Sequence, residues 1–89
     1  MKLLEGKTVL VTGASTGIGR AAAIGAAQHG ADVVINYHSR DDDADACIAA
    51  IEATGQRGLA IKGDVAEAAT ATDFVWKAVA EFGRVDVMV

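Results

Sequence analysis

The sequence of 89 residues contains no proline, a single cysteine and no long apolar run. Because proline and low-complexity linkers are both absent, nothing marks an internal boundary, and we predict one small domain over residues 1–89. Cys47 has no partner for an internal disulfide, which favours a reducing, cytoplasmic location. No apolar stretch approaches the roughly 20 residues of a membrane span. The first residues are too few and too charged for a signal peptide.

Basic residues are also scarce. Eight Lys and Arg against twelve Asp and Glu give a formal charge of −4, which argues against nucleic acid or an anionic membrane as a partner. Hydrophobic residues, by contrast, make up 52% of the chain, a high fraction for a small domain. This composition favours strands that are buried on both faces, as in a parallel sheet.

Apolar runs alternate with helical patterns along the chain. We predict strands over residues 7–12, 31–37, 59–63 and 85–89. We predict helices over residues 17–29, through the alanine-rich segment that ends at 52, and from 64 to 82, with Gly30 and Gly83 ending the first and the third. This alternation predicts an α/β fold, a Rossmann-like doubly wound parallel sheet of about four strands and three helices, with right-handed crossovers.

The helical patterns also predict which side chains are buried. Cys47 shares a face with Ala44, Ile48 and Ile51, so we interpret it as a small buried hydrophobe and not as a catalytic thiol. In the third helix we expect one apolar stripe against the sheet, with Trp76 beside it at the helix edge. The members of that stripe are Ala71, Val75, Ala78, Val79 and Phe82.

A glycine-rich turn connects the first strand to the first helix. Its sequence is Thr12-Gly13-Ala14-Ser15-Thr16-Gly17-Ile18-Gly19. Gly13 suits a tight turn, Gly17 lets an anion approach the main chain, and Gly19 lets the helix lie close to the sheet. The free N–H groups of the helix start then favour a phosphate. A nucleotide-triphosphate loop would need Gly-Lys-Ser/Thr where Ile18-Gly19-Arg20 stands, so we reject that class of site. The alternative without a ligand is a plain glycine-rich turn.

Four motifs in the same order resemble the short-chain dehydrogenase/reductase family. They are Thr12-Gly13-x-x-x-Gly17-Ile18-Gly19, Asn36-Tyr37-His38-Ser39, Gly63-Asp64-Val65 and Phe82-Gly83-Arg84-Val85-Asp86. The resemblance runs from about residue 7 to residue 89 and covers only the N-terminal, cofactor-binding part of such enzymes. Glucose 1-dehydrogenases and 3-oxoacyl-carrier-protein reductases are the members that the chain resembles most.

The resemblance implies a site for a nicotinamide dinucleotide. The residues implied at its pyrophosphate and ribose are Gly13, Ser15, Thr16, Gly17, Ile18 and Gly19. Asp64 would accept a hydrogen bond from the adenine amino group, with the main chain of Val65 beside it. Asp64 also begins a capping-box pattern, Asp64-Val65-Ala66-Glu67, and both roles are compatible because a carboxylate has several acceptor sites.

The end of the second strand is expected to read the 2′ group of the cofactor. Members selective for NAD carry an Asp there, which holds the ribose hydroxyls and repels a 2′-phosphate. Here Tyr37 occupies that place, followed by His38 and Ser39 where NADP-using members often carry Arg and a small polar residue. NADP(H) is therefore favoured mildly and NAD(H) is allowed. Ser39 has an alternative role as the start of a capping box, Ser39-Arg40-Asp41-Asp42, and Arg40 is expected either to offset these acids or to meet the phosphate.

The family's catalytic residues are not found in these 89 residues. The chemistry needs a Tyr with a Lys four residues later, a Ser and an Asn, but the only tyrosine is Tyr37 and Asp41 follows it at that distance. We therefore assign no catalytic residue here. The resemblance implies that a complete member transfers hydride between the nicotinamide and a carbonyl or alcohol, such as a sugar or a 3-oxoacyl thioester, and forms a homo-oligomer, typically a tetramer.

Two other functions are considered. A stand-alone, non-catalytic module would bind a dinucleotide, or bind a partner through the apolar fourth strand. A calcium loop is a weaker alternative, in which Asp41, Asp43, Asp45 and Glu52 would take ligand positions. The glycine that such a loop needs is Ala46 here, and a continuous helix would separate the carboxylates.

Overall fold

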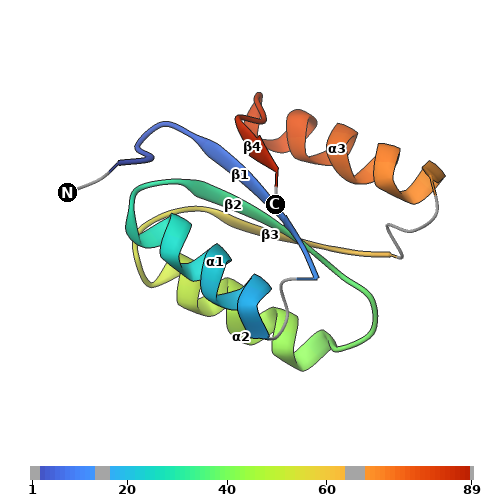
Figure 1. Ribbon diagram of the computed structural model, residues 1–89, viewed down its shortest axis with the longest axis horizontal. Helices are drawn as coiled ribbons and strands as arrows, with labels where there is room; N and C mark the ends of the chain where they lie inside the picture. The colour runs from blue at the N-terminus through green and yellow to red at the C-terminus, as the bar shows by residue number, and fades with distance from the viewer. Residues whose placement is uncertain (1–2, 14–16, 64–67, 89) are drawn as a thin grey trace.

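The computed structural model describes residues 3–13, 17–63 and 68–88, which form strands and helices in strict alternation (Figure 1). In chain order these elements are β1 Thr8–Thr12, α1 Gly17–Gln28, β2 Asp32–Tyr37, α2 Asp41–Glu52, β3 Gly58–Lys62, α3 Ala68–Phe82 and β4 Val87–Met88. Their order and type confirm the sequence prediction, and most predicted ends differ from these bounds by one or two residues. The predicted capping box at residues 64–67 lies outside the described residues.

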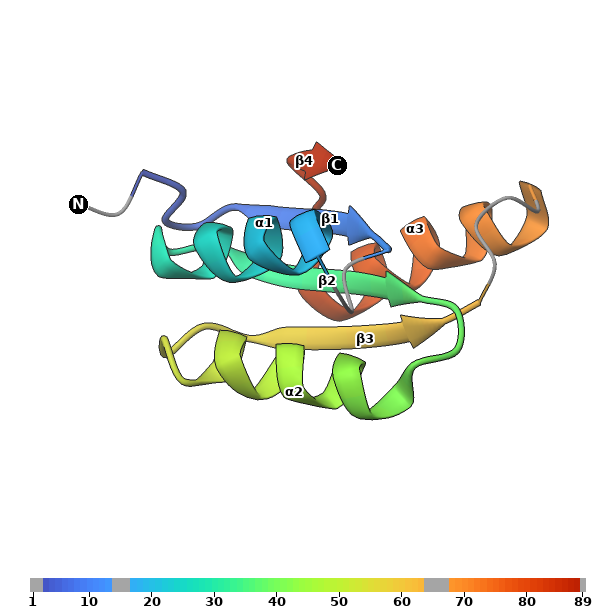
Figure 2. The same cartoon turned by 60° about the horizontal axis from the view of Figure 1, so that its bottom comes forward.

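The strands form one parallel sheet in the order β3-β2-β1-β4. Figures 1 and 2 show α1 and α2 on one face of this sheet and α3 on the other. The chain moves outward from β1 to β3 and then returns past β1 to β4. If all crossovers have the same hand, that reversal must place α3 on the opposite face, which is what the model shows. The predicted doubly wound architecture is confirmed.

Alternate residues of the central strands supply two separate apolar layers. On the α1/α2 side, Val9 and Val11 of β1 pack in one buried cluster with Val33 and Ile35 of β2. On the α3 side, Leu10 of β1 belongs to a second cluster. Burial on both faces explains why these strands read as unbroken apolar runs.

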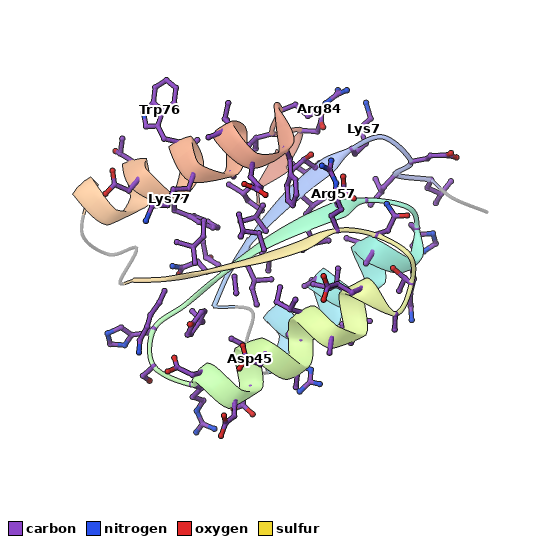
Figure 3. All side chains as sticks on the ribbon, turned by 180° about the vertical axis from the view of Figure 1, so that it is seen from behind. Lys7, Asp45, Arg57, Trp76, Lys77 and Arg84 are labelled. Carbon is purple, nitrogen blue, oxygen red and sulfur yellow. The ribbon has the colours of Figure 1, made fainter. Side chains whose placement is uncertain are left out.

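The predicted apolar stripe of α3 is confirmed at Val75, Ala78 and Phe82, but it omitted one buried residue. Phe74, which the stripe omitted, is only 2% exposed and packs with Ala78 against the sheet. Val75 and Phe82 are partly buried beside them, while the side chain of Ala71 lies outside the described residues. Trp76 is 67% exposed and points away from the sheet in Figure 3, so it contributes little to the core.

The α2 helix begins at Asp41 with Arg40 at its N-cap, and no side chain caps it. The capping-box role for Ser39 is therefore wrong, because the helix starts one residue too late for that pattern. Cys47 is fully buried, as predicted, and this burial raises the pKa of its thiol. From Asp41 to Glu52 the helix is continuous, which spreads the carboxylates of the calcium pattern along it. Among the described residues, no helix is long and apolar enough to cross a membrane.

A network of polar contacts ties the starts of β2 and β3 to α3. The Asp32 carboxylate accepts hydrogen bonds from Nε and Nη2 of Arg57, at 3.0 and 2.7 Å. The Arg57 guanidinium also lies over the Phe82 ring, 4.5 Å from its centroid. Because guanidinium groups bind carboxylates and aromatic faces at once, Arg57 joins three elements at this end of the sheet.

The β4 strand begins at Val87, two residues later than predicted, and its described residues are Val87–Met88, while residue 89 of the predicted strand lies outside the described residues. The cause lies in Asp86, whose carboxylate accepts a 2.9 Å hydrogen bond from the Thr8 backbone N–H. The Asp86 N–H in turn donates to the Thr8 carbonyl oxygen at 2.9 Å. A side chain thus takes the place of a strand carbonyl, and the regular ladder begins only after it.

Acid is expected to weaken the hydrogen bonding between Asp86 and Thr8. Hydrogen bonds from Arg84 and from the Thr8 backbone hold the pKa of Asp86 below its ordinary value of 3.8. A carboxylate whose pKa is lowered in the folded state stabilises the fold above its unfolded-state pKa, and this contribution disappears as pH falls through the folded-state pKa. The loss of stability between pH 5 and pH 3, measured by urea unfolding, should be smaller in Asp86→Asn than in the native protein. Equal losses would show that Asp86 carries none of it.

Candidate functional site

The connections after β1, β2 and β3 all lie at the same edge of the sheet, because the three strands are parallel. β1 and β4 are neighbours, yet the chain leaves β1 toward α1 on one face and reaches β4 from α3 on the other. In open α/β sheets, ligands bind in the crevice that this change of face opens beyond the carboxyl ends of the strands. The glycine-rich turn after β1 lies at this point.

The glycine-rich turn has backbone angles that few side chains tolerate. Gly13 and Gly17 have φ values of +61° and +62°, in the left-handed region that favours glycine. A Cβ atom at either position would meet nothing within 4 Å, so the main chain is open to solvent there. The predicted contacts Ser15 and Thr16 lie outside the described residues. Open backbone at the start of a helix fits an anion, because the N–H groups and the helix dipole both favour one.

The first turn of α1 presents further predicted residues. Ile18 is 90% exposed, which is unusual for a large apolar side chain, and Gly19 is half-buried. An exposed isoleucine beside open backbone at a helix start would give a ligand an apolar surface. The arrangement fits a dinucleotide, which carries two phosphates between two partly apolar ends.

At the end of β2, Tyr37 is half-buried and packs against the α1/α2 cluster. Partial burial raises the pKa of its phenol, and the nearby charge of Asp41 raises it further. A tyrosine that transfers protons near neutral pH needs the opposite shift. The direction of this shift makes Tyr37 unsuited to proton transfer near neutral pH.

The predicted residues His38 and Ser39 follow in an exposed connection between β2 and α2. A surface hollow of about 460 Å³ lies beside it, lined by Ser39, Arg40, Asp41, Asp42 and Asp43. Arg40 Nη1 donates to Asp43 Oδ2 at 3.2 Å. Of the two roles left open for Arg40, the structure shows the first, in which it offsets the acids of the helix start.

The sequence reasoning missed the role of Asn36. Its side chain is only 3% exposed, and its Nδ2 donates to the carbonyl oxygens of Ile61 and Gly63 at 3.2 and 3.0 Å. These bonds tie β2 to the end of β3, next to the predicted adenine-binding residues Asp64 and Val65, which lie outside the described residues. The available signal was an amide residue inside an otherwise apolar strand, because buried polar groups need partners.

An aspartate in place of Asn36 should break the hydrogen bonds that tie β2 to the end of β3. In Asn36→Asp a carboxylate would face two carbonyl oxygens, and the loss of both donated bonds should cost at least about 2 kcal/mol of unfolding free energy. Asn36→Ser, which keeps one donor, should lose less. Urea unfolding at pH 8 measures both variants, and an Asn36→Asp variant as stable as the native protein would contradict this role.

Known proteins with similar sequences and structures share the α/β fold described above. A family model described as short chain dehydrogenase matches residues 7–89. The chain belongs to the short-chain dehydrogenase family. An L-rhamnose 1-dehydrogenase (NAD(P)(+)) of Sphingomonas sp. (strain SKA58) is 75% identical over 89 residues, which are 100% of this chain and 35% of that protein.

Solved structures of short-chain dehydrogenases share this fold. One from Burkholderia cenocepacia J2315, in complex with NADP, has a TM-score of 0.93 and 42% identity over 96% of this chain and 35% of its own. A hydroxysteroid dehydrogenase from Escherichia coli has a TM-score of 0.87 and 30% identity over 96% of this chain and 36% of its own. The chain thus spans about a third of the length of the relatives it matches. It is an oxidoreductase-family sequence that matches the N-terminal part of these relatives. The relatives' printed cofactors, NAD(P)(+) and NADP, are nicotinamide dinucleotides.

Proposed function

We propose that these 89 residues are the N-terminal, cofactor-binding part of a longer NAD(P)-dependent oxidoreductase. The observation that carries the proposal is the glycine-rich turn, where Gly13 and Gly17 leave open backbone at the start of α1. The shared length supports it too, because the match to longer dehydrogenases covers one third of them and all or nearly all of this chain.

The residues proposed to hold the cofactor are those that the sequence predicted. The glycine turn with Ser15, Thr16 and Ile18 would bind the pyrophosphate and the adjacent ribose, and Asp64 with Val65 would bind the adenine. Tyr37, His38 and Ser39 would meet the 2′ group. When bound, the cofactor supplies the hydride chemistry, and this chain supplies binding, orientation and exclusion of water.

We propose a mild preference for NADP(H), with NAD(H) accepted. No carboxylate occupies the end of β2 itself, since Tyr37 stands there, so a 2′-phosphate meets no immediate repulsion. The preference is mild because Asp41, Asp42 and Asp43 form the first turn of α2 close by. The relative from Sphingomonas, whose name gives both cofactors, supports acceptance of either.

We propose a sugar as the substrate, oxidised at a carbinol or reduced at a carbonyl carbon. The support is the 75% identity to a protein named as an L-rhamnose 1-dehydrogenase. A fatty acyl thioester is the other substrate class considered. No catalytic residue is assigned within residues 1–89, and we propose that the Asn, Ser, Tyr and Lys of the reaction lie later in the complete gene product. That product would be a homo-oligomer, as the family resemblance implies, and its single cysteine in residues 1–89 favours the cytoplasm.

Cofactor binding tests the proposal directly. NADP⁺ at about 100 times its dissociation constant should stabilise the complete gene product by about 2.7 kcal/mol. For a product about three times as long as this chain, that gain corresponds to a rise of about 5–10 °C in melting temperature. ATP, which lacks the nicotinamide half, should give a smaller rise at equal concentration. The absence of any rise with NADP⁺ and with NAD⁺ would contradict the proposed site.

Two observations distinguish the dehydrogenase from the alternative, a stand-alone binding module. They are the gene sequence past residue 89 and the activity of the isolated chain. A reading frame that continues past residue 89 into an Asn-Asn-Ala-Gly segment and a Tyr-x-x-x-Lys motif supports the dehydrogenase. A native stop codon after residue 89 supports the module. The isolated 89-residue chain should show no turnover with L-rhamnose and NADP⁺, and measurable turnover would contradict our assignment of the catalytic residues.

A further inference from the structure

Lys62, the last residue of β3, lies beside the proposed 2′ site although it is far from it in sequence. In the parallel register, Tyr37 of β2 is paired with Lys62 of β3. The Gly63 N–H also donates to the Tyr37 carbonyl oxygen at 2.9 Å, which fixes the two strand ends together. Lys62 therefore lies on the strand next to Tyr37, the residue that is proposed to contact the ribose.

An aspartate from a third element holds the Lys62 ammonium. Lys62 Nζ lies 3.2 Å from Asp41 Oδ1. Both side chains are more than half exposed, at 55% for Lys62 and 60% for Asp41. Exposed pairs of this kind are weak, typically about 0.2–1 kcal/mol, so a ligand with a stronger charge can displace the carboxylate.

The surrounding charges leave few other cations for a phosphate. Among the described residues here, Arg40 is paired with Asp43, and Asp42 and Asp45 add further negative charge. Lys62 is thus the cation that β2 and β3 jointly place at this strand end, and in the described part of the chain its ion-pair partner is Asp41.

We propose that Lys62 binds the 2′-phosphate of NADP and that the Asp41 carboxylate repels this phosphate. This pair then sets the ratio of the affinities for NADP and NAD. The inference rests on the proposed dinucleotide site and adds a residue that neither the glycine turn nor the β2–α2 connection contains. With NAD, the Lys62–Asp41 pair persists and the ribose hydroxyls carry no charge. With NADP, Lys62 exchanges the Asp41 carboxylate for the more highly charged phosphate.

The test compares two small ligands that differ only in the 2′ group. Binding of adenosine 2′,5′-bisphosphate and of 5′-AMP to the complete gene product is measured by isothermal titration calorimetry at low salt. Lys62→Gln should weaken the bisphosphate about fivefold to tenfold and leave 5′-AMP within about twofold. Lys7→Gln is the matched control, because Lys7 precedes β1 at the far end of the sheet (Figure 3), and it should change neither affinity.

Removal of the opposing charge should act in the other direction. Asp41→Asn should strengthen the bisphosphate about threefold to fivefold, because it frees Lys62 and removes a repelling carboxylate. Asp42→Asn makes the same change of net charge in the same helical turn without touching Lys62, so its gain should be smaller, below about twofold. In a Lys62→Gln background, the Asp41→Asn gain should fall to that of Asp42→Asn.

The outcomes separate this inference from the proposed function. A native protein that binds neither ligand, and neither NADP⁺ nor NAD⁺, overturns both. If the native protein binds both ligands and Lys62→Gln weakens them equally or not at all, only the role of Lys62 is overturned. Equal gains from Asp41→Asn and Asp42→Asn would show that net charge alone acts and would overturn the Lys62–Asp41 pair as the determinant.

Discussion

Gly17→Ala is expected to weaken both NADP⁺ and NAD⁺ about 100-fold, which corresponds to about 2.7 kcal/mol of binding free energy. Gly17 has a φ of +62° and an open face, so an added Cβ projects from the turn at the place where the phosphates are proposed to approach the main chain. The effect should be the same for both cofactors, because the pyrophosphate is common to them. Calorimetric titration of the complete gene product measures it.

Gly55→Ala is the control for backbone strain. Gly55 also has a positive φ, +92°, and a Cβ there would likewise meet nothing within 4 Å, but it follows α2 at the other end of the sheet. Each alanine should cost about 1–2 kcal/mol of unfolding free energy. Gly55→Ala should bind both cofactors like the native protein. If Gly55→Ala and Gly17→Ala lose similar amounts of cofactor affinity, backbone strain acts through global stability. Gly17 would then not contact the phosphates of the cofactor.

Tyr37→Asp should move the preference from NADP to NAD by about 100-fold in the ratio of their dissociation constants. A carboxylate at the end of β2 would accept hydrogen bonds from the ribose hydroxyls, worth about 1.5–3 kcal/mol each for a charged group, and would repel a 2′-phosphate. The ratio is the appropriate measurement, because Tyr37 also packs against the core and its loss will weaken both complexes.

Tyr37→Asn separates charge from size. It removes the same packing and adds no charge, so its NADP/NAD ratio should stay within about threefold of the native value. If Tyr37→Asp leaves the ratio unchanged, the 2′ group of the cofactor does not lie at the end of β2. The proposed roles of His38 and Ser39 would then fall with that of Tyr37.

The order of strands and helices was predictable because it depends on local patterns. Buried parallel strands show as apolar runs, and turns show as glycines, so the position of Gly17 between β1 and α1 could be read directly from the chain. The full membership of the buried face of α3 was harder to predict, since small residues occupy both sides of its apolar stripe. Phe74 was missed for this reason, although it is among the largest buried side chains.

Contacts between residues distant in sequence could not be predicted. The bonds from Asn36 to the end of β3 span 25 and 27 residues, and the Thr8–Asp86 bond spans 78. Such pairs depend on the register of neighbouring strands, which a pattern of apolar residues does not fix in detail. Lys62 belongs to the same class, because nothing near it in sequence indicates that it lies beside Tyr37 and Asp41.

The measurement that tests the account most directly is a crystal structure of the complete gene product with NADP⁺. We expect the two central phosphates at the start of α1, with backbone N–H groups of the segment from Gly13 to Gly19 donating to their oxygens. The adenosine ribose should lie at the carboxyl ends of β2 and β3. A cofactor bound at another edge of the sheet, or a glycine turn covered by its own side chains with the phosphates elsewhere, would contradict the account.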